Sequence, residues 1–138
     1  EEQAKIEDKN PVLLEALGNI YMLEAANYEK AEKTFQKAFA LSGDGQQLFN
    51  RGRALAALKK YEEAIEVLLQ SRRISEQEGD VTDGEDMELV RCYIGLKDKK
   101  NAEKYLELAR EGADNVADEF IDEYEEELEQ LEDMIDEL

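Results

Sequence analysis

The sequence predicts an all-α protein, built as a helical-hairpin solenoid of about seven helices. Three observations support this fold class. Pairs of amphipathic helical stretches recur along the chain at a period in the mid-thirties, which is typical of helical repeats. The 138 residues include one proline, and runs of β-branched residues are scarce, so helices are favoured over strands. A chain of this length is expected to form one domain and to bury most of its apolar surface.

The first helical pair covers residues 14–41, with a short break near Asn27. Small residues such as Gly18 and Ala31 alternate with large ones such as Phe35, which lets two helices approach closely and interlock. The residues that share one face at helical spacing are Leu14, Leu17, Gly18 and Tyr21 in the first half and Ala31, Phe35, Ala38 and Leu41 in the second.

A second copy of this pattern begins 34 residues later. Gly52 repeats Gly18, and the segment at 61–65, Tyr-Glu-Glu-Ala-Ile, repeats Tyr-Glu-Lys-Ala-Glu at 28–32. A third and weaker copy contains Leu89, Tyr93, Leu96, Ala102, Leu106 and Ala109. Paired helices at this period indicate a solenoid, in which each hairpin buries its apolar face against its neighbours.

The series Leu-Gly, Tyr, Ala, Phe, Ala in the first copy resembles the tetratricopeptide repeat (TPR) family; the second copy matches well and the third is degraded. The resemblance covers roughly residues 11–112. It implies a right-handed solenoid of three hairpins, at 11–44, 45–78 and 83–112. It also implies binding of a protein or peptide, without identifying the partner, because the family serves many unrelated partners.

The segments that flank and connect the repeats carry their own signals. Residues 1–10 are a polar lead-in, either a disordered leader or the end of an earlier repeat, and Asn10 followed by Pro11 predicts a helix start. Because the chain begins at Glu1 without Met, we expect it to be a processed or truncated piece of a longer chain. This expectation is compatible with the removal of a targeting segment. Residues 79–84 form a longer connection between repeats two and three. We interpret its Gly and Asp residues as turn formers and not as the ligands of a calcium loop. Gly112 is placed to end the last helix of repeat three.

The tail, residues 113–138, is expected to be an acidic amphipathic capping helix. From 114 onward it carries 13 acidic and no basic residues, against a net charge of −19 for the whole chain. Burial of large apolar side chains, at ~1.5–3 kcal/mol each, outweighs the repulsion along the helix, so the stripe needs a partner surface. The stripe consists of Ala117, Ile121, Tyr124, Leu128, Leu131, Ile135 and Leu138, widened by Phe120 and Met134.

Three partners compete for this stripe: repeat three, a second copy of the tail, and an external cationic protein. Docking on repeat three is favoured because residues 97–110 are the most basic stretch of the chain. Self-pairing would place four acidic residues beside the seam with no cation opposite them, namely Asp118, Glu125, Glu127 and Glu132. The resemblance to the TPR family also implies a solvating helix that docks at the end of the repeat array.

Composition argues against several classes of function. There is no His, no nucleophile–base pair, no phosphate loop and no metal-ligand spacing, so we expect neither an enzyme, a cofactor nor a metal site. The acidic charge disfavours nucleic acid, and the apolar runs are too short for membrane insertion. The lone Cys92 favours a reducing, cytoplasmic location, and it is expected to be a buried, inert thiol.

The resemblance also implies a concave groove lined by the first helix of each repeat. In this groove an apolar residue and an arginine lie one turn apart in two repeats, Phe49 with Arg53 and Met87 with Arg91. The predicted lining residues are Asn19, Met22, Gln46, Phe49, Asn50, Arg53, Met87 and Arg91, with Val12, Glu15, Glu88 and Ile94 expected on the same face.

One specific groove of the family can be excluded. The clamp for the acidic tails of heat-shock chaperones needs Lys and Asn in repeat one, Asn in repeat two, and Lys and Arg in repeat three. Asn19 and Asn50 match, whereas Glu15, Gly84 and Glu88 stand where cations are required.

Two interpretations of the arginines remain open at this point. Arg53 and Arg91 either contact a partner or pair with neighbouring acids, and 36 acidic residues make the second interpretation at least as strong. The predicted function is a protein-binding adaptor or scaffold, similar to a co-chaperone, in a monomer or weak homo-oligomer. The alternatives are a structural homo-oligomer assembly domain and a small acidic secretion-type chaperone.

Overall fold

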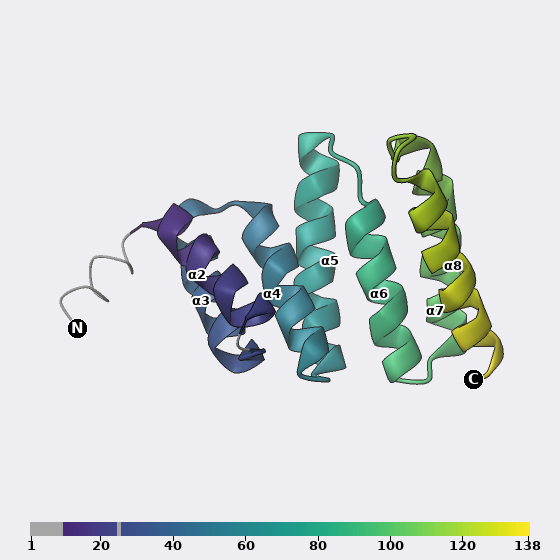
Figure 1. Ribbon diagram of the computed structural model, residues 1–138, viewed down its shortest axis with the longest axis horizontal. Helices are drawn as coiled ribbons and strands as arrows, with labels where there is room; N and C mark the ends of the chain where they lie inside the picture. Colours follow the sequence, from purple (N-terminus) through teal and green to yellow (C-terminus); the bar gives the residue numbers. More distant parts are fainter. Residues whose placement is uncertain (1–9, 25) are drawn as a thin grey trace. The chain divides into compact units, whose positions relative to one another are not determined.

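The computed structural model describes residues 10–24 and 26–138, and within them the protein is all-α, with seven α-helices, a single 3-10 turn and no strand (Figure 1). The expected helical-hairpin class is confirmed. The elements are α2 (Pro11–Leu23), α3 (Tyr28–Ser42), α4 (Gly45–Ala57), α5 (Tyr61–Glu78), α6 (Asp83–Gly95), α7 (Lys99–Glu111), η1 (Gly112–Asn115) and α8 (Ile121–Asp136). The expected leader, residues 1–9, lies outside the described residues.

The chain divides into two compact units rather than the single domain expected from its length. The first unit ends at Ser71 and the second runs from Arg72 to Leu138, so the boundary falls within α5. The physical reason is that hairpins in a repeat array contact mainly their neighbours, so the buried residues do not form one core shared by all hairpins.

Side-chain caps begin four of the described helices, and the one at Asn10 is the cap that the sequence predicts. The Asn10 side chain accepts hydrogen bonds from the backbone N–H groups of Val12 (3.0 Å) and Leu13 (3.3 Å), and Pro11 is the first helical residue of α2. Asn27, Asp44 and Asp98 cap α3, α4 and α7 in the same way. These caps satisfy amide groups that have no partner inside the helix.

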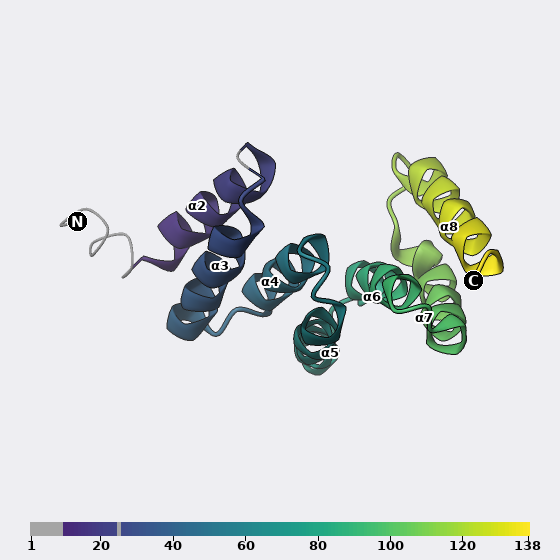
Figure 2. The ribbon, with the colours of Figure 1, turned by 90° about the horizontal axis from the view of Figure 1, so that it is seen from below.

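The core of the first unit is an interlock of small and large residues. Within this unit α3 packs against both α2 and α4 (Figure 2). Phe35 is fully buried with Ala31 and Ala54, and a Cβ built on Gly18 would lie 2.5 Å from the Phe35 ring. A Cβ on Gly52 would lie 2.6 Å from Leu68. Each glycine therefore makes room for the large residue of its own hairpin, as the alternation predicts.

In the second unit, α7 packs against both α6 and α8 (Figure 1). The tail helix buries three residues of the predicted stripe, Leu128, Leu131 and Ile135. The buried part of the stripe is shorter than expected, and Ala117 and Phe120 lie outside the helix because α8 begins only at Ile121, after η1 and a turn. The side chains of this stripe that stay exposed are Ala117, Phe120, Met134 and Leu138.

Two connections differ from expectation. The extra residues between repeats two and three lie partly within α5, which is 18 residues long against 15 for α3, and α6 already begins at Asp83. Gly112 follows α7 but is right-handed, with φ −73°, and η1 continues from it. A Cβ on Gly112 would lie 3.0 Å from the Cβ of Asp83, so close packing against the start of α6, and not a left-handed turn, favours glycine there.

Candidate protein-binding site

In the first unit, the predicted groove residues lie on α2 and α4. Asn19, Gln46 and Arg53 are exposed, and Phe49 is half-buried. Met22 is half-buried because it packs against the cluster around Phe35. The two helices are joined by a hydrogen bond from the Gln47 amide to the Glu15 carboxylate. These contacts hold the exposed polar groups on a fixed surface.

Arg53 and Phe49 form the most distinctive pair on α4. The guanidinium carbon of Arg53 lies 5.9 Å from the centre of the Phe49 ring, within the range of a cation–π contact. Among the described residues Arg53 makes no ion pair with an acid. The guanidinium of Arg53 thus lies over the Phe49 ring, and its N–H groups are available to the carboxylate of a ligand.

Asn50, which was predicted to line the same surface, is buried instead. It lies on the side of α4 that packs toward the interior, and its side-chain oxygen accepts a hydrogen bond from Gln46 Nε2 at 3.2 Å. The neighbouring Gln47 is also buried, and its carbonyl oxygen has no hydrogen-bond partner in the described part of the chain. Asn50 therefore orients Gln46 and offers almost no surface of its own.

In the second unit, Met87 and Arg91 of α6 have different surroundings from their counterparts on α4. Met87 is buried in the core. Arg91 pairs with Glu88 on its own helix and with Glu127 on α8. The interpretation in which an arginine pairs with neighbouring acids thus holds for Arg91. The sequence comparison of Phe49–Arg53 with Met87–Arg91 missed this difference, because Glu127 lies 36 positions further along the chain.

A polar cluster between the end of α5 and α6 was not anticipated. Arg72 Nε donates to Asp86 at 2.7 Å, Thr82 Oγ1 donates to the other oxygen of Asp86 at 3.0 Å, and Ser75 donates to Glu85 at 2.8 Å. Burial alone would lower the pKa of Arg72, but the hydrogen bond and the charge of Asp86 raise it, so the guanidinium stays charged. The cluster is structural, because Asp86 is buried and fully engaged.

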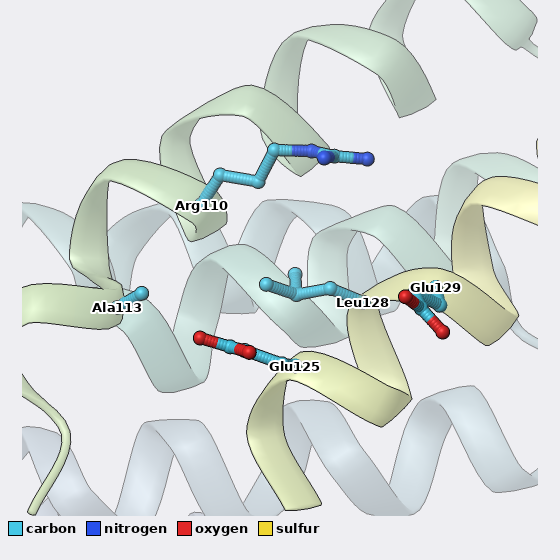
Figure 3. Close-up of a pocket in the computed structure, with 5 residues that line it drawn as sticks. All are labelled: Arg110, Ala113, Glu125, Leu128 and Glu129. Carbon is cyan, nitrogen blue, oxygen red and sulfur yellow. The ribbon is translucent and has the colours of Figure 1, made fainter. Parts of the chain in front are cut away.

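The contact between α7 and α8 leaves a surface pocket of about 290 Å³ (Figure 3). Its lining places Leu128 between the guanidinium of Arg110 and the carboxylate of Glu125. Arg110 pairs with Glu132, and the Tyr124 hydroxyl donates to the Ala109 carbonyl oxygen at 2.6 Å. Burial, followed by the charges of Asp83 and Asp86, raises the pKa of Tyr124 to about 12. Arg110 of the basic stretch at 97–110 thus pairs with the acidic tail, and Tyr124 of the tail bonds the backbone of α7.

Cys92 is fully buried in α6, and burial raises the pKa of its thiol to about 12, with a smaller contribution from Glu88. The unfolded thiol ionises near pH 9, whereas the folded one stays protonated. The associated stabilisation is therefore complete below pH 9 and is lost as pH rises toward 12.

We expect the wild-type protein to lose about 2 kcal/mol more than Cys92→Ala between pH 8 and pH 10.5, since each pH unit above the unfolded pKa is worth about 1.4 kcal/mol. Urea unfolding of both proteins at the two pH values measures this difference. The cavity left by alanine lowers stability equally at both pH values, so parallel pH dependences would contradict the assignment.

Within residues 10–24 and 26–138, no group of three or more His, Cys, Asp or Glu side chains is arranged to hold a metal ion. Nor does that part of the chain contain a helix that is long and apolar enough to cross a membrane.

Comparison with known families gives one result. The family model described as "Tetratricopeptide repeat" matches residues 13–44, 48–78 and 87–109, which together exceed half of the chain. The three matches coincide with the three hairpins whose first helices are α2, α4 and α6. Neither a curated protein nor a solved structure gave a match.

Proposed function

The chain belongs to the tetratricopeptide-repeat family, whose repeats generally mediate protein–protein interaction, and on this premise we propose that it is a non-enzymatic adaptor or scaffold. It binds a peptide or an extended segment of a partner on the exposed face of its first-of-pair helices. In the first unit this face consists of Asn19 and Met22 on α2 and of Gln46, Phe49 and Arg53 on α4.

The observation that carries the proposal is the Arg53–Phe49 pair. An arginine that lies over an aromatic ring and has no acidic partner in the described structure is suited to a carboxylate next to an apolar side chain. Asn19 and Gln46 are exposed amides, which supply both donors and acceptors to a peptide backbone. The ligand class is therefore a short segment with an acidic group and an adjacent apolar residue.

Most of the acidic charge of the chain lies in the tail. Of the net charge of −19, residues 114–138 contribute −13, and the preceding 113 residues, which include Arg53, contribute −6. Screening at physiological salt limits the reach of each charge to about 8 Å, so the charges within that distance of Arg53 decide how a ligand carboxylate binds there.

Arg53→Ala tests the proposal, with Arg91→Ala as the matched control. Peptides selected from a random displayed library on the full chain are measured by fluorescence anisotropy against each protein. Loss of a charge-assisted contact, at ~1.5–3 kcal/mol, is expected to weaken binding about ten- to a hundred-fold in Arg53→Ala. Arg53→Lys keeps the charge but not the bidentate geometry, so an intermediate loss is expected.

Arg91→Ala is expected to leave the affinity of the same peptides nearly unchanged, because Arg91 is engaged by Glu88 and Glu127. Equal affinity of the selected peptides for wild type and Arg53→Ala would contradict the proposed site. A larger loss in Arg91→Ala than in Arg53→Ala would move the site to the second unit.

A further inference from the structure

Arg91 of α6 occupies the helical position that Arg53 occupies on α4. Both helices have 13 residues, and each arginine is the ninth residue of its helix. Arg53 makes no ion pair in the described part of the chain, whereas the guanidinium of Arg91 binds two carboxylates, those of Glu88 and Glu127. Within the described structure, the position that has no ion pair on α4 is therefore filled from within the chain on α6.

The two carboxylates at Arg91 come from different elements. Glu88 lies three residues earlier on α6 and pairs with Nη1 of Arg91, so this contact belongs to the helix itself. Glu127 comes from α8 and pairs with Nη2. A carboxylate that reaches an arginine from a separate element makes the same charge-assisted contact as the carboxylate of a bound partner. Glu127 thus stands at Arg91 in the place of a ligand.

Glu127 differs from the other acidic residues of α8. It is half-buried, whereas every other Asp and Glu of this helix is exposed. Its side chain still keeps 42% of its surface, and that of Arg91 keeps 36%. An ion pair with this exposure is weak, because water solvates both partners when they separate. The Glu127 carboxylate can therefore turn into solvent and leave Arg91 to another carboxylate.

The docking of α8 does not depend on Glu127. Three apolar side chains of α8 are buried, namely Leu128, Leu131 and Ile135. The Tyr124 hydroxyl donates to a backbone carbonyl oxygen of α7 at 2.6 Å, and Glu132 pairs with Arg110 of α7. Burial of three large side chains outweighs one exposed ion pair. The ion pair of Glu127 is therefore not needed to hold the tail helix in place.

We propose that Arg91 is a second carboxylate-binding site, which Glu127 of the tail helix occupies as an internal ligand. A partner carboxylate binds there by displacing Glu127 from Nη2, while Glu88 stays on Nη1 and the apolar side of α8 stays docked. Arg91 then binds the kind of ligand proposed for the Arg53 surface, so this site rests on the proposed function. By linkage, a bound partner weakens the contact of Glu127 with α6, and that contact weakens the binding of the partner.

The surroundings of Arg91 restrict the ligand to a segment with a single carboxylate. Such a ligand replaces Glu127 at Nη2 charge for charge. A run of acidic residues, in contrast, is repelled by Glu88 and by the remaining acidic residues of α8, a helix that contains no basic residue. The half-buried Ile94, three residues after Arg91, supplies an apolar contact on the same face. The ligand is therefore a peptide with one Asp, Glu or free C-terminus next to an apolar side chain.

Glu127→Ala tests this site, with Glu132→Ala as the matched control. Both glutamates lie on α8 and pair with an arginine, and both substitutions remove one negative charge, but Glu127 pairs with α6 and Glu132 with α7. Arg53→Ala is kept in every protein compared, so that the surface on α4 does not contribute. Peptides are selected from a random displayed library on the full chain with Arg53→Ala and Glu127→Ala, and their dissociation constants are measured by fluorescence anisotropy.

The selected peptides are expected to bind about two- to five-fold more tightly with Glu127→Ala than without it, because the ligand no longer has to displace an exposed ion pair. Glu132→Ala in place of Glu127→Ala is expected to leave the affinity unchanged. The gain should disappear when Arg91→Ala is added to Glu127→Ala. It should also disappear when the carboxylate of the peptide is replaced by an amide.

The rate at which phenylglyoxal modifies Arg91, measured by mass spectrometry, reports on the guanidinium without any peptide. We expect modification to become about two- to five-fold faster with Glu127→Ala, because one of the two carboxylates no longer engages the guanidinium. The rate is expected to stay unchanged with Glu132→Ala. Circular dichroism checks that both variants keep the helical content of the parent chain.

Equal peptide affinity with and without Glu127→Ala would overturn the site. So would a gain that survives Arg91→Ala, or an equal gain from Glu132→Ala, which would trace the effect to net charge or to a loosened α8. Faster modification of Arg91 without a gain in affinity would mean that Glu127 pairs with Arg91 for structure alone. Since Arg53 is replaced in all these proteins, such a result refutes the second site and leaves the test of the Arg53 surface unaffected.

Discussion

Replacing Leu131 by Asp is expected to destabilise the second unit by on the order of 3–5 kcal/mol. Leu131 is 4% exposed where α8 packs, so the change removes a buried apolar side chain and places an unpaired carboxylate there. Relative to a total stability of ~5–15 kcal/mol, this loss is large enough to unfold α7 and α8 partly at 37 °C. Chemical denaturation followed by circular dichroism measures the change.

Met134→Asp is the matched control on the same helix. Met134 is 49% exposed, so the same carboxylate enters solvent, and a change of at most about 0.5 kcal/mol is expected. Removal of residues 114–138 should resemble Leu131→Asp and expose α7 to protease. Equal stability of the two Asp variants would mean that α8 does not act as a cap for repeat three.

Gly18→Ala is expected to destabilise the first unit by about 1–3 kcal/mol, although alanine is the better helix former by roughly 1 kcal/mol. The added Cβ would lie 2.5–2.9 Å from three carbons of the Phe35 ring, and that ring is fully buried. The ring cannot move without displacing Ala31 and Ala54, with which it packs. Thermal and urea unfolding of the purified variant test this expectation.

A double-mutant cycle identifies the cause of the loss. Phe35→Leu by itself leaves a cavity, but in combination with Gly18→Ala the new methyl group occupies part of that space, so the two losses should add to more than the loss in the double variant. Additive losses would show that the methyl group added at position 18 and the ring of Phe35 do not share this space.

The sequence by itself determined the fold class and the family. Gly18 and Gly52 recur at a period of 34 residues, with the large Phe35 between them, and this pattern predicts hairpins that interlock. The structure places each glycine against the large residue of its own hairpin. The cap at Asn10, the burial of Cys92 and the apolar stripe of the tail also followed from local chemistry. Such features depend on neighbours within one or two helical turns or one repeat, so periodicity exposes them.

Tertiary structure alone decided which groove residues reach the surface. Arg53 and Arg91 occupy equivalent positions, yet Arg53 lies over Phe49 without an ion pair in the described structure, and Arg91 is held by Glu88 and by Glu127 of α8. Asn50 and Met87 are buried although the resemblance to the family placed them on the lining face. The reason is that burial depends on which other helix covers a face, and a repeat pattern gives equivalent residues the same position but not the same neighbours.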